Sequence, residues 1–186
     1  MAGGRNNVIT ELVTDHREVE EMFTRFDKAV PGSEDRKQIA HEFTIELVRH
    51  SVAEEEHLYP AVRRHVPGGD ALADKELKDH AGVEKLLKQV EQLPPGAATF
   101  DELVATLQAE VAAHVRDEEN NLFPRLREAC TDEELLDLGD KIRSAKKTAP
   151  TRPHPHAPNT PPGNKLLAPG TGLVDRVRDY LTGRGR

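Results

Sequence analysis

Tryptophan is absent from this chain of 186 residues, and aromatic residues make up only 4% of it, so the core must be built from aliphatic side chains. The single cysteine, Cys130, excludes an internal disulfide bond and indicates a reducing compartment. The N-terminal segment MAGGRNNVITELV has no apolar core of about 7–15 residues, so no secretory signal is expected. No stretch approaches the ~18 apolar residues of a membrane span. Together these absences predict a cytoplasmic protein without a membrane span.

The net charge of −7 is unevenly distributed along the chain. Residues 141–186 contain ten Lys and Arg against two Asp, a balance of +8, whereas residues 1–140 contain 16 Lys and Arg against 31 Asp and Glu, a balance of −15. An acidic body repels nucleic acid, so no nucleic-acid partner is expected. It suits the binding of cations, although an ordinary solvated surface explains most of these charges equally well.

The sequence contains an internal repeat at an offset of 64 residues. The segment DHREVE, residues 15–20, matches DHAGVE, residues 79–84, at four of six positions. The same offset maps EEEHLYP, residues 54–60, onto EENNLFP, residues 118–124, and the intervening sequence aligns without a gap. A repeat of this kind indicates one supersecondary unit that is used twice.

Apolar residues and histidines recur in steps of three and four, which is the pattern of one helix face. The pattern is interrupted at Pro31-Gly32, at residues 67–69 (PGG) and at residues 94–96 (PPG), so four main helices are predicted. Pro60 is expected to bend or end the second helix. Short loops make sequential helices antiparallel neighbours, and the predicted fold class is therefore all-α, an up-down-up-down four-helix bundle.

Several helix starts are marked by residues that cap free backbone N–H groups. Ser33 is the expected N-cap of the second helix, and Asp70 is the expected N-cap of the third. Residues 99–102 and 131–134 have the capping-box pattern, in which Thr is followed three residues later by Glu. The second box opens a short additional helix, which is expected to end at roughly residue 145.

After the bundle the composition changes. Residues 147–170 form a Pro-rich linker, which is expected to be extended and disordered. Residues 171–186 form a short basic tail, in which apolar residues at helical spacing predict an amphipathic helix: Leu173, Val174, Val177, Tyr180 and Leu181. The opposite charges of tail and body favour a contact between them, and a solubilising extension is the alternative. The bundle itself is assigned to residues 6–146.

Each of the four main helices carries a histidine on the face that should be apolar, and the second and fourth add a glutamate one turn later. The set is His16, His50, Glu54, His80, His114 and Glu118. Because residues i and i+4 differ by only about 40° around a helix, each His-x-x-x-Glu pair points in one direction. Burying an unpaired carboxylate costs on the order of several kcal/mol, so a compensating cation is expected. Six ligands without a thiolate argue against structural zinc, and the set suits paired iron or manganese ions.

These residues resemble the hemerythrin-like (HHE cation-binding) family, in the variant with the pattern H…HxxxE…H…HxxxE. The motifs here are His16, HSVAE at residues 50–54, His80 and HVRDE at residues 114–118, and the EEHLYP and ENNLFP segments are also similar. The resemblance covers roughly residues 6–145. It implies a non-haem di-iron centre with Glu54 and Glu118 as bridging ligands. His16 with His50 would bind one iron, and His80 with His114 would bind the other.

The sequence departs from the oxygen-carrying hemerythrins, which place a His-x-x-x-His pair on the third helix. Here the third helix has His80-x-x-x-Glu84, and Glu20 occupies the matching place on the first helix. Glu84 is therefore a candidate extra metal ligand, and Glu20 is a second candidate. An ordinary carboxylate at the edge of the bundle is the alternative for both. An added carboxylate ligand would favour oxidised metal and weaken the case for reversible O2 carriage.

Four other residues bear on the site. Glu46 and Glu110 precede a histidine by four residues, so they could accept a hydrogen bond from its second ring nitrogen or lie exposed. Tyr59 falls about 180° from the histidine of its helix, so it should face away from the site unless the following proline reorients it. Cys130 has no base near it in the sequence and is interpreted as unreactive.

The first functional hypothesis is a di-iron protein that acts on a small oxidant, namely O2, peroxide or nitric oxide. Seven apolar residues are expected to form a pocket that excludes larger substrates: Leu12, Val19, Phe23, Leu47, Val83, Leu87 and Val111. The second hypothesis is an iron, oxygen or redox sensor that signals through its tail without turnover. A metal-free scaffold is the third, and it leaves the buried carboxylates unexplained. The sequence does not decide between an enzyme and a binding protein.

Overall fold

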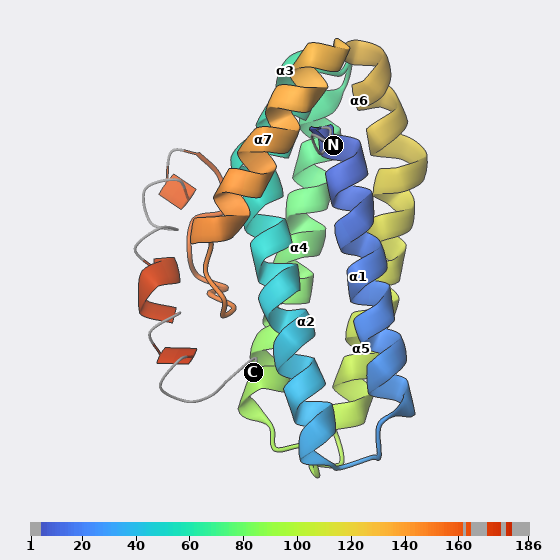
Figure 1. Cartoon of the computed structure of the whole chain (residues 1–186), viewed down its shortest axis with the longest axis vertical. Helices are drawn as coiled ribbons and strands as arrows, with labels where there is room; N and C mark the ends of the chain where they lie inside the picture. Colours follow the sequence, from blue (N-terminus) through green and yellow to red (C-terminus); the bar gives the residue numbers. More distant parts are fainter. Residues whose placement is uncertain (1–4, 162, 165–170, 176–177, 180–186) are drawn as a thin grey trace.

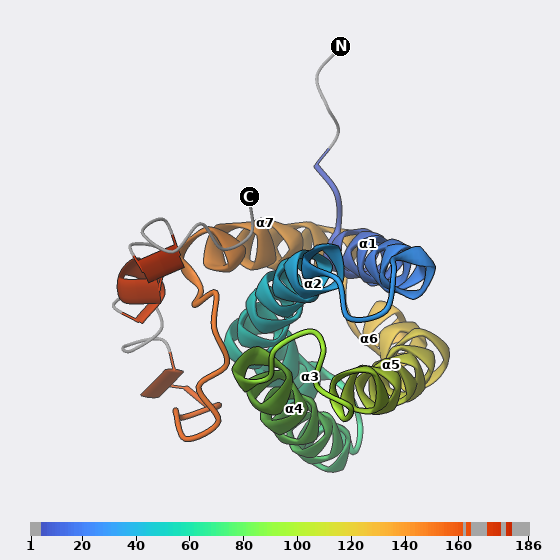
Figure 2. The ribbon, with the colours of Figure 1, turned by 90° about the horizontal axis from the view of Figure 1, so that it is seen from below.

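The computed structural model describes residues 5–161, 163–164, 171–175 and 178–179. Four long helices dominate this part of the chain: α1 (Val8–Lys28), α2 (Glu34–Ala53), α4 (Gly69–Gln92) and α5 (Phe100–Asp117). They run side by side along the long axis of the molecule (Figure 1), and seen end-on they surround a common centre (Figure 2). The predicted all-α four-helix bundle is confirmed.

Shorter elements extend the bundle at one end. A π-helical turn, η1 (Glu54–Leu58), and helix α3 (Tyr59–His65) continue α2, while η2 (Glu118–Leu122) and α6 (Phe123–Ala129) continue α5. The predicted additional helix is α7 (Asp132–Thr148), which packs against α1 and α2 and covers one side of the bundle (Figure 1). None of the described helices is long and apolar enough to cross a membrane.

The two π-helical turns occupy corresponding places in the repeat, and each ends two residues before a proline. Pro60 and Pro124 have no backbone N–H, and in a regular helix their rings would clash with the carbonyl group four residues earlier. A widened turn relieves this conflict, because the residue before each proline donates its N–H to the carbonyl group five residues earlier. The extra residue rotates the side chains that follow by roughly 100° relative to a straight helix. The bend predicted at Pro60 is therefore a π-bulge.

Two of the predicted helix caps are confirmed. The Ser33 hydroxyl accepts a hydrogen bond from the backbone N–H of Arg36 at 3.3 Å. At α7 the capping box is complete, because the Glu134 N–H donates to the Thr131 hydroxyl and the Thr131 N–H donates to the Glu134 carboxylate at 2.8 Å. Such caps satisfy N–H groups that lack a partner within the helix, and each is worth about 1 kcal/mol.

The other two predicted caps are wrong. Helix α4 begins at Gly69, after Gly68 in the left-handed conformation (φ 73°), so Asp70 lies inside the first turn. A Cβ atom on Gly69 would lie 2.1 Å from the carbonyl oxygen of Val62, so the close approach of α3 requires glycine there. At the start of α5 the backbone of Thr99 is already helical (φ −86°, ψ −5°), and its side chain makes no capping hydrogen bond.

The core consists of two apolar clusters separated by a polar layer. The upper cluster in Figure 1 joins the beginnings of α1 and α4 to α3, α6 and α7. The lower cluster joins the remaining parts of the four long helices and includes an edge-to-face ring pair, Phe23 with Phe43, whose centroids are 5.1 Å apart. On α1, Leu12 belongs to the upper cluster and Val19 to the lower one, with His16 between them. The polar layer is thus enclosed by apolar side chains above and below.

Part of the linker packs against the bundle. Thr151 and Arg152 are buried, and the Arg152 guanidinium pairs with Glu91 of α4 at 2.8 Å. The expectation of a disordered linker does not hold at these residues. Arg152 lies in the basic part of the chain, residues 141–186, and this contact joins it to the acidic body.

The described part of the tail presents a polar side to the rest of the chain. Residues 171–175 are helical, but Leu173 and Val174 are 61% and 66% exposed, whereas Asp175 is buried. The apolar face predicted for this segment therefore does not pack on the bundle at these two positions. Val177, Tyr180 and Leu181 lie outside the described residues.

Candidate metal centre

The polar layer contains all six residues singled out from the sequence. One histidine comes from each long helix, and one glutamate begins each π-helical turn: His16 (α1), His50 (α2), His80 (α4), His114 (α5), Glu54 (η1) and Glu118 (η2). All six are buried, and the two glutamates are 0% exposed. The helical spacing of four residues aims each glutamate at the same interior as the histidine one turn earlier.

The two carboxylates connect the histidines in a regular way. Glu54 Oε2 lies 3.2 Å from His50 Nε2 and 3.3 Å from His80 Nε2. Glu118 Oε2 lies 3.4 Å from His16 Nε2 and 3.5 Å from His114 Nε2. Each carboxylate therefore contacts one histidine from the first half of the repeat and one from the second. Each carboxylate could therefore hold a cation together with a histidine from either half.

Several buried atoms of the site are unsatisfied. Within the described part of the chain, His16 Nε2, Glu54 Oε1 and Glu118 Oε2 have no hydrogen-bond partner. An unsatisfied buried polar atom costs roughly 1–3 kcal/mol. Ligand atoms of His16, His50, Glu54 and Glu118 lie within 4.8 Å of one another, as do those of Glu54, His80 and His114. Imidazole and carboxylate donors at this spacing fit divalent first-row metal ions.

Each histidine contacts a further carboxylate through its other ring nitrogen, Nδ1. Glu119 contacts His16 at 2.8 Å, and Glu55 contacts His80 at 3.1 Å. The repeat generates this contact twice, since Glu55 and Glu119 are 64 residues apart, as are the two histidines. A carboxylate at Nδ1 holds the proton of a neutral imidazole on that atom and leaves the Nε2 lone pair for a metal.

The other two histidines use partners that the repeat does not duplicate. Asp15 Oδ2 lies 3.2 Å from His50 Nδ1, whereas His114 Nδ1 lies 2.8 Å from Glu76 Oε2. Asp79, the repeat counterpart of Asp15, pairs with a surface lysine at 2.8 Å instead. In both halves the second histidine therefore has a carboxylate at Nδ1, but the residue that supplies this carboxylate differs.

For Glu46 and Glu110 the sequence left two alternatives, a contact with a histidine or a surface position, and the structure favours the second. Glu46 pairs with Arg49 at 2.9 Å, and Glu110 is exposed. The Nδ1 atoms contact carboxylates of other elements instead. The sequence did carry a signal for two of the true partners, since Glu55 and Glu119 follow Glu54 and Glu118 directly in both copies.

Tyr59 also enters the site. Its hydroxyl lies 3.0 Å from His80 Nε2, 3.2 Å from Glu118 Oε1 and 3.4 Å from Glu54 Oε2. A straight helix would turn this side chain away, and the π-bulge before Pro60 supplies the rotation that brings it in. Burial and the charges of the two glutamates raise the pKa of Tyr59 well above its ordinary value, so the hydroxyl keeps its proton.

At the matching position of the second half, the sequence has Phe123 in place of tyrosine. Its ring stacks on His16 with centroids 5.9 Å apart and an interplanar angle of 7°. One end of the site therefore has a hydroxyl group, and the other is covered by a hydrocarbon ring.

A small cavity of about 20 Å³ lies among the four histidines. Five apolar residues line it together with polar ones: Val19, Leu47, Val83, Val111 and Val115. Four of these belong to the pocket expected from the sequence. Leu12, Phe23 and Leu87 do not line this cavity, and they lie in the two apolar clusters above and below it. A cavity of this size has room for one or two water-sized molecules, at roughly 10–15 Å³ each.

Residues 7–126 match the hemerythrin HHE cation binding domain family, and this range includes all six site residues. The chain belongs to this family. The HHE match supports the assignment of the buried His and Glu layer as a cation-binding site.

Two curated relatives and one solved structure extend this finding. An uncharacterized hemerythrin-like protein of Schizosaccharomyces pombe is 27% identical over 171 residues, or 91% of this chain and 84% of that protein. A DNA nickase of Nostoc sp. is 32% identical over 144 residues, or 75% of this chain but only 39% of the nickase. The crystal structure of a hemerythrin HHE cation binding domain-containing protein from Mycobacterium kansasii has a TM-score of 0.68 and 24% identity, covering 76% of this chain and 86% of that chain. This last likeness shows a shared fold.

The two candidate extra ligands of the HHE site have other partners. Glu84 accepts a hydrogen bond from the backbone N–H of His154 at 2.7 Å. Glu20 pairs with Arg17 at 2.8 Å, and its side chain is 56% exposed. Neither belongs to the groups of converging ligand atoms found among the described residues. These contacts favour the alternative of bundle-edge carboxylates, and a ligand role for either residue stays a prediction.

Without a bound cation, the charges of the HHE site compensate one another. Burial alone would lower the pKa of His50, but the charge of Glu54 and the hydrogen bond to Asp15 outweigh it and raise the pKa to about 10. Burial would also lower the pKa of His80. The hydrogen bonds to Glu54 and Glu55 and the charges of both carboxylates outweigh this effect and raise the pKa to about 10. Burial would raise the pKa of Glu54, but the two imidazolium groups hold it well below its ordinary range. A metal ion that binds here must therefore displace protons.

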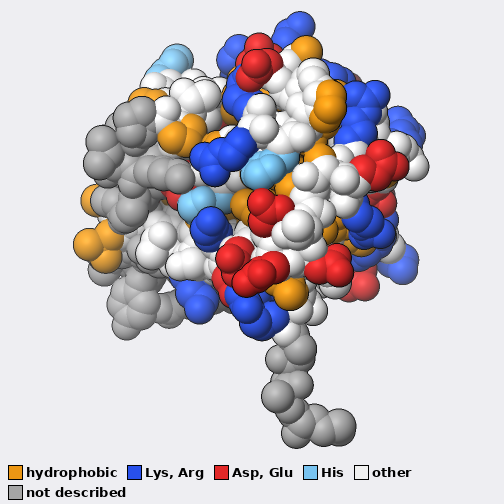
Figure 3. All heavy atoms as spheres, turned by 90° about the horizontal axis from the view of Figure 1, so that it is seen from above, with side chains coloured by type: hydrophobic (Ala, Val, Ile, Leu, Met, Phe, Trp, Pro, Cys, Tyr) orange, Lys and Arg blue, Asp and Glu red, His pale blue; other side chains and the backbone are white. Residues whose placement is uncertain are grey.

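A separate group of donor atoms lies at the end of the bundle seen in Figure 3, where acidic and basic side chains are interspersed. Ligand atoms of His65, Cys130 and Glu134 lie within 4.8 Å of one another there. Burial and the charge of Glu134 raise the pKa of the Cys130 thiol, so it stays protonated. The raised pKa agrees with the interpretation of Cys130 as unreactive, whereas His65 supplies a nearby base that the sequence did not reveal.

Proposed function

We propose that the protein binds a pair of non-haem iron ions, with manganese as the alternative metal, and acts on a small oxidant. The proposed ligands are His16, His50, Glu54, His80, His114 and Glu118. The observation that carries the proposal is that each buried carboxylate contacts one histidine of each pair, at 3.2–3.5 Å. Bound ions of this kind supply redox and Lewis-acid chemistry toward O2, peroxide or nitric oxide.

The surrounding side chains set the conditions for this chemistry. The apolar clusters above and below the layer exclude bulk water, which strengthens every electrostatic interaction inside it. The cavity of about 20 Å³ suits molecules the size of O2 or peroxide and is too small for a larger organic substrate. The carboxylates at Nδ1 fix the orientation of each imidazole ring.

Tyr59 is the proposed proton donor of the site. Its hydroxyl faces the ligand set and keeps its proton at neutral pH, because burial and two carboxylates oppose its ionisation. A proton donor beside the ions favours reduction of a bound oxidant over its reversible binding. This argument supports decomposition of peroxide or a related oxidant more than O2 carriage.

A sensor or iron-binding module is the second candidate function, and one observation favours it. Glu84 lies one turn after His80 on α4 and holds the backbone of His154 in the C-terminal segment. A change at His80 could therefore alter the contacts of that segment. The nicking activity named for the Nostoc protein is not carried over, since the chain spans 39% of that protein and its body is acidic.

Metal analysis and kinetics test the proposal. Protein purified after iron-replete expression should contain about two iron ions per chain and show near-ultraviolet charge-transfer absorption. One zinc ion, or no metal, would contradict it. Consumption of peroxide by the iron-loaded protein would support an enzyme, whereas stable iron binding without turnover would support the sensor.

A further inference from the structure

Two more cavities lie beside the one among the histidines. A cavity of about 30 Å³ touches α2 and α4 and shares three lining residues with the inner cavity: Ser51, His80 and Val83. An outer cavity of about 50 Å³ shares four residues with this middle cavity: Val48, Val52, Glu55 and Glu84. Cavities that share lining residues are neighbours, so the three form a series in which His80 lies in the wall between the middle and inner cavities.

Residues of the C-terminal segment line one side of the outer cavity. Pro150, Arg152 and His154 line it on the side opposite α2 and α4. In Figure 2 the chain that follows α7 runs beside these two helices. We call residues 150–154, together with Asp175 and Asp179, the latch.

Two contacts fasten the latch to α4. The Arg152 guanidinium donates a hydrogen bond to Glu91 at 2.8 Å, and the backbone N–H of His154 donates to Glu84 at 2.7 Å. Both acceptors lie on the helix that carries His80. The Arg152 contact is largely shielded from water, since both side chains are only 10–11% exposed.

The latch is also held together internally. The carboxylate of Asp175 accepts hydrogen bonds from the backbone N–H groups of Thr151 and Arg152 at 3.2 and 3.1 Å, and it lies 2.9 Å from His154 Nε2. Asp179 pairs with Arg152 from the same side. These bonds make residues 150–154 a defined structure rather than a loose linker.

We propose that the latch closes a side route through which a small, neutral oxidant reaches the metal centre at His80. The inference rests on the proposed function for the identity of the ligand, but the closure itself does not. The middle cavity has room for about two water-sized molecules, which suits nitric oxide, O2 or peroxide. Two carboxylates, Glu55 and Glu84, line the route and disfavour the passage of anions.

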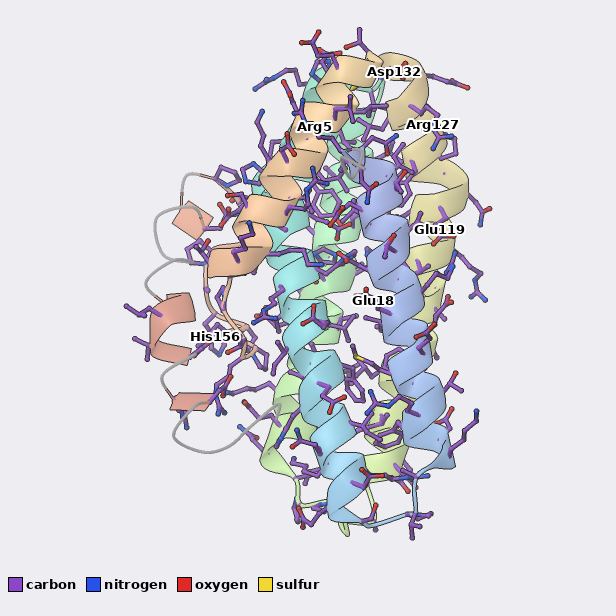
Figure 4. All side chains as sticks on the ribbon, in the orientation of Figure 1. Arg5, Glu18, Glu119, Arg127, Asp132 and His156 are labelled. Atoms are coloured by element: carbon purple, nitrogen blue, oxygen red, sulfur yellow. The ribbon has the colours of Figure 1, made fainter. Side chains whose placement is uncertain are left out.

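The labelling rate of a cysteine placed in the wall of the route reports whether the route is closed, and this measurement needs no bound metal. Val48 is buried and lines both outer cavities, so a Val48→Cys substitution in a Cys130→Ser background provides the probe. In the metal-free protein, adding Arg152→Gln should speed the reaction of this thiol with a soluble disulfide reagent about ten-fold. Adding His156→Ala should leave the rate unchanged, because His156 is an exposed residue of the same segment (Figure 4).

A second probe separates opening of the latch from unfolding of the bundle. Ala40 is 1% exposed in the lower cluster and lines none of the three cavities, so an Ala40→Cys thiol reports general unfolding. Its reaction rate should not respond to Arg152→Gln. The proposed closure would be wrong if Arg152→Gln did not change the labelling rate of the thiol at position 48. It would also be wrong if Arg152→Gln accelerated labelling equally at positions 40 and 48.

Nitric oxide binding tests whether the route serves the metal centre. Stopped-flow measurements on the reduced, iron-loaded protein should show faster nitric oxide association in Arg152→Gln than in His156→Ala. Faster thiol labelling with unchanged nitric oxide association would overturn the route, because the cavities would then be a dead end. If neither protein binds nitric oxide, the proposed ligand chemistry fails, and the thiol rates still decide whether the latch closes the cavities.

Discussion

The two halves of the repeat, residues 15–60 and 79–124, agree where they hold the cation site and differ where a ligand would meet it. Both supply a histidine on each helix, a glutamate at the start of a π-helical turn and a carboxylate directly after it. They differ at the residue before the proline, which is Tyr59 in the first half and Phe123 in the second. Tyr59 places a hydroxyl at His80, and Phe123 covers His16 with a ring. The duplicated residues thus form the cation-binding layer of His and Glu, and the unduplicated ones give a hydroxyl group to only one end of it.

The largest effect is expected where the two halves are most alike. Glu54→Gln and Glu118→Gln should each lower iron content from about two ions per chain to less than one, because each carboxylate contacts a histidine of both pairs. Elemental analysis of the purified variants measures this. Glu46→Gln is the matched control, since Glu46 pairs with Arg49 and should leave iron content unchanged. If either site variant retained two ions, that carboxylate would not be a bridging ligand.

The next prediction compares the two aspartates that the repeat places before a histidine. Asp15 contacts His50 Nδ1, whereas Asp79 pairs with a surface lysine. Asp15→Asn should therefore weaken iron binding about 10–100-fold, the usual cost of losing a partner that orients a metal-bound histidine. Asp79→Asn should change it less than two-fold, in keeping with a weak exposed ion pair. Competition with a chelator gives both affinities, and equal losses would show that the asymmetry seen here is irrelevant to binding.

The sequence predicted the bundle and the six converging residues because both follow from periodicity. Apolar spacing fixes which face of a helix is buried, and the same spacing placed His16, His50, His80 and His114 on that face. The partners of their Nδ1 atoms could not be found in this way, since they depend on how neighbouring helices are rotated. Glu76 is the clearest case, because its repeat counterpart is Leu12 and no periodicity marks it.

The π-bulges and the latch escaped prediction for other physical reasons. Pro60 signalled an irregularity, but a kink, a helix end and a widened turn are all compatible with a missing N–H. Only the widened turn brings Tyr59 into the site. The proline content of residues 147–170 indicated extended chain, but composition does not reveal that Arg152 pairs with Glu91 of α4.

Exchanging the residues that distinguish the halves should alter reactivity more than metal content. Tyr59→Phe makes the first half like the second and removes the hydroxyl between His80 and the two glutamates. Iron content should stay near two, while peroxide consumption should fall about ten-fold or more through loss of a proton donor. Phe123→Tyr is the reciprocal variant and should not restore activity to Tyr59→Phe, because Phe123 stacks on His16 at the other end of the site. If Tyr59→Phe consumed peroxide at the wild-type rate, Tyr59 would not be the proton donor.

The smallest effect on the metal is expected at Glu20 and Glu84, which the repeat places in equivalent positions and the fold uses differently. Glu20 pairs with Arg17 at the surface, and Glu84 holds the N–H of His154. Glu20→Gln and Glu84→Gln should therefore both retain about two ions per chain, with unchanged oxidation rates after reduction and exposure to air. Only Glu84→Gln should also speed labelling of the Val48→Cys thiol, because a neutral amide holds the latch less firmly than a carboxylate. Loss of iron in Glu84→Gln alone would instead establish that carboxylate as a ligand, and the first-half residue would then be the only bundle-edge glutamate of the pair.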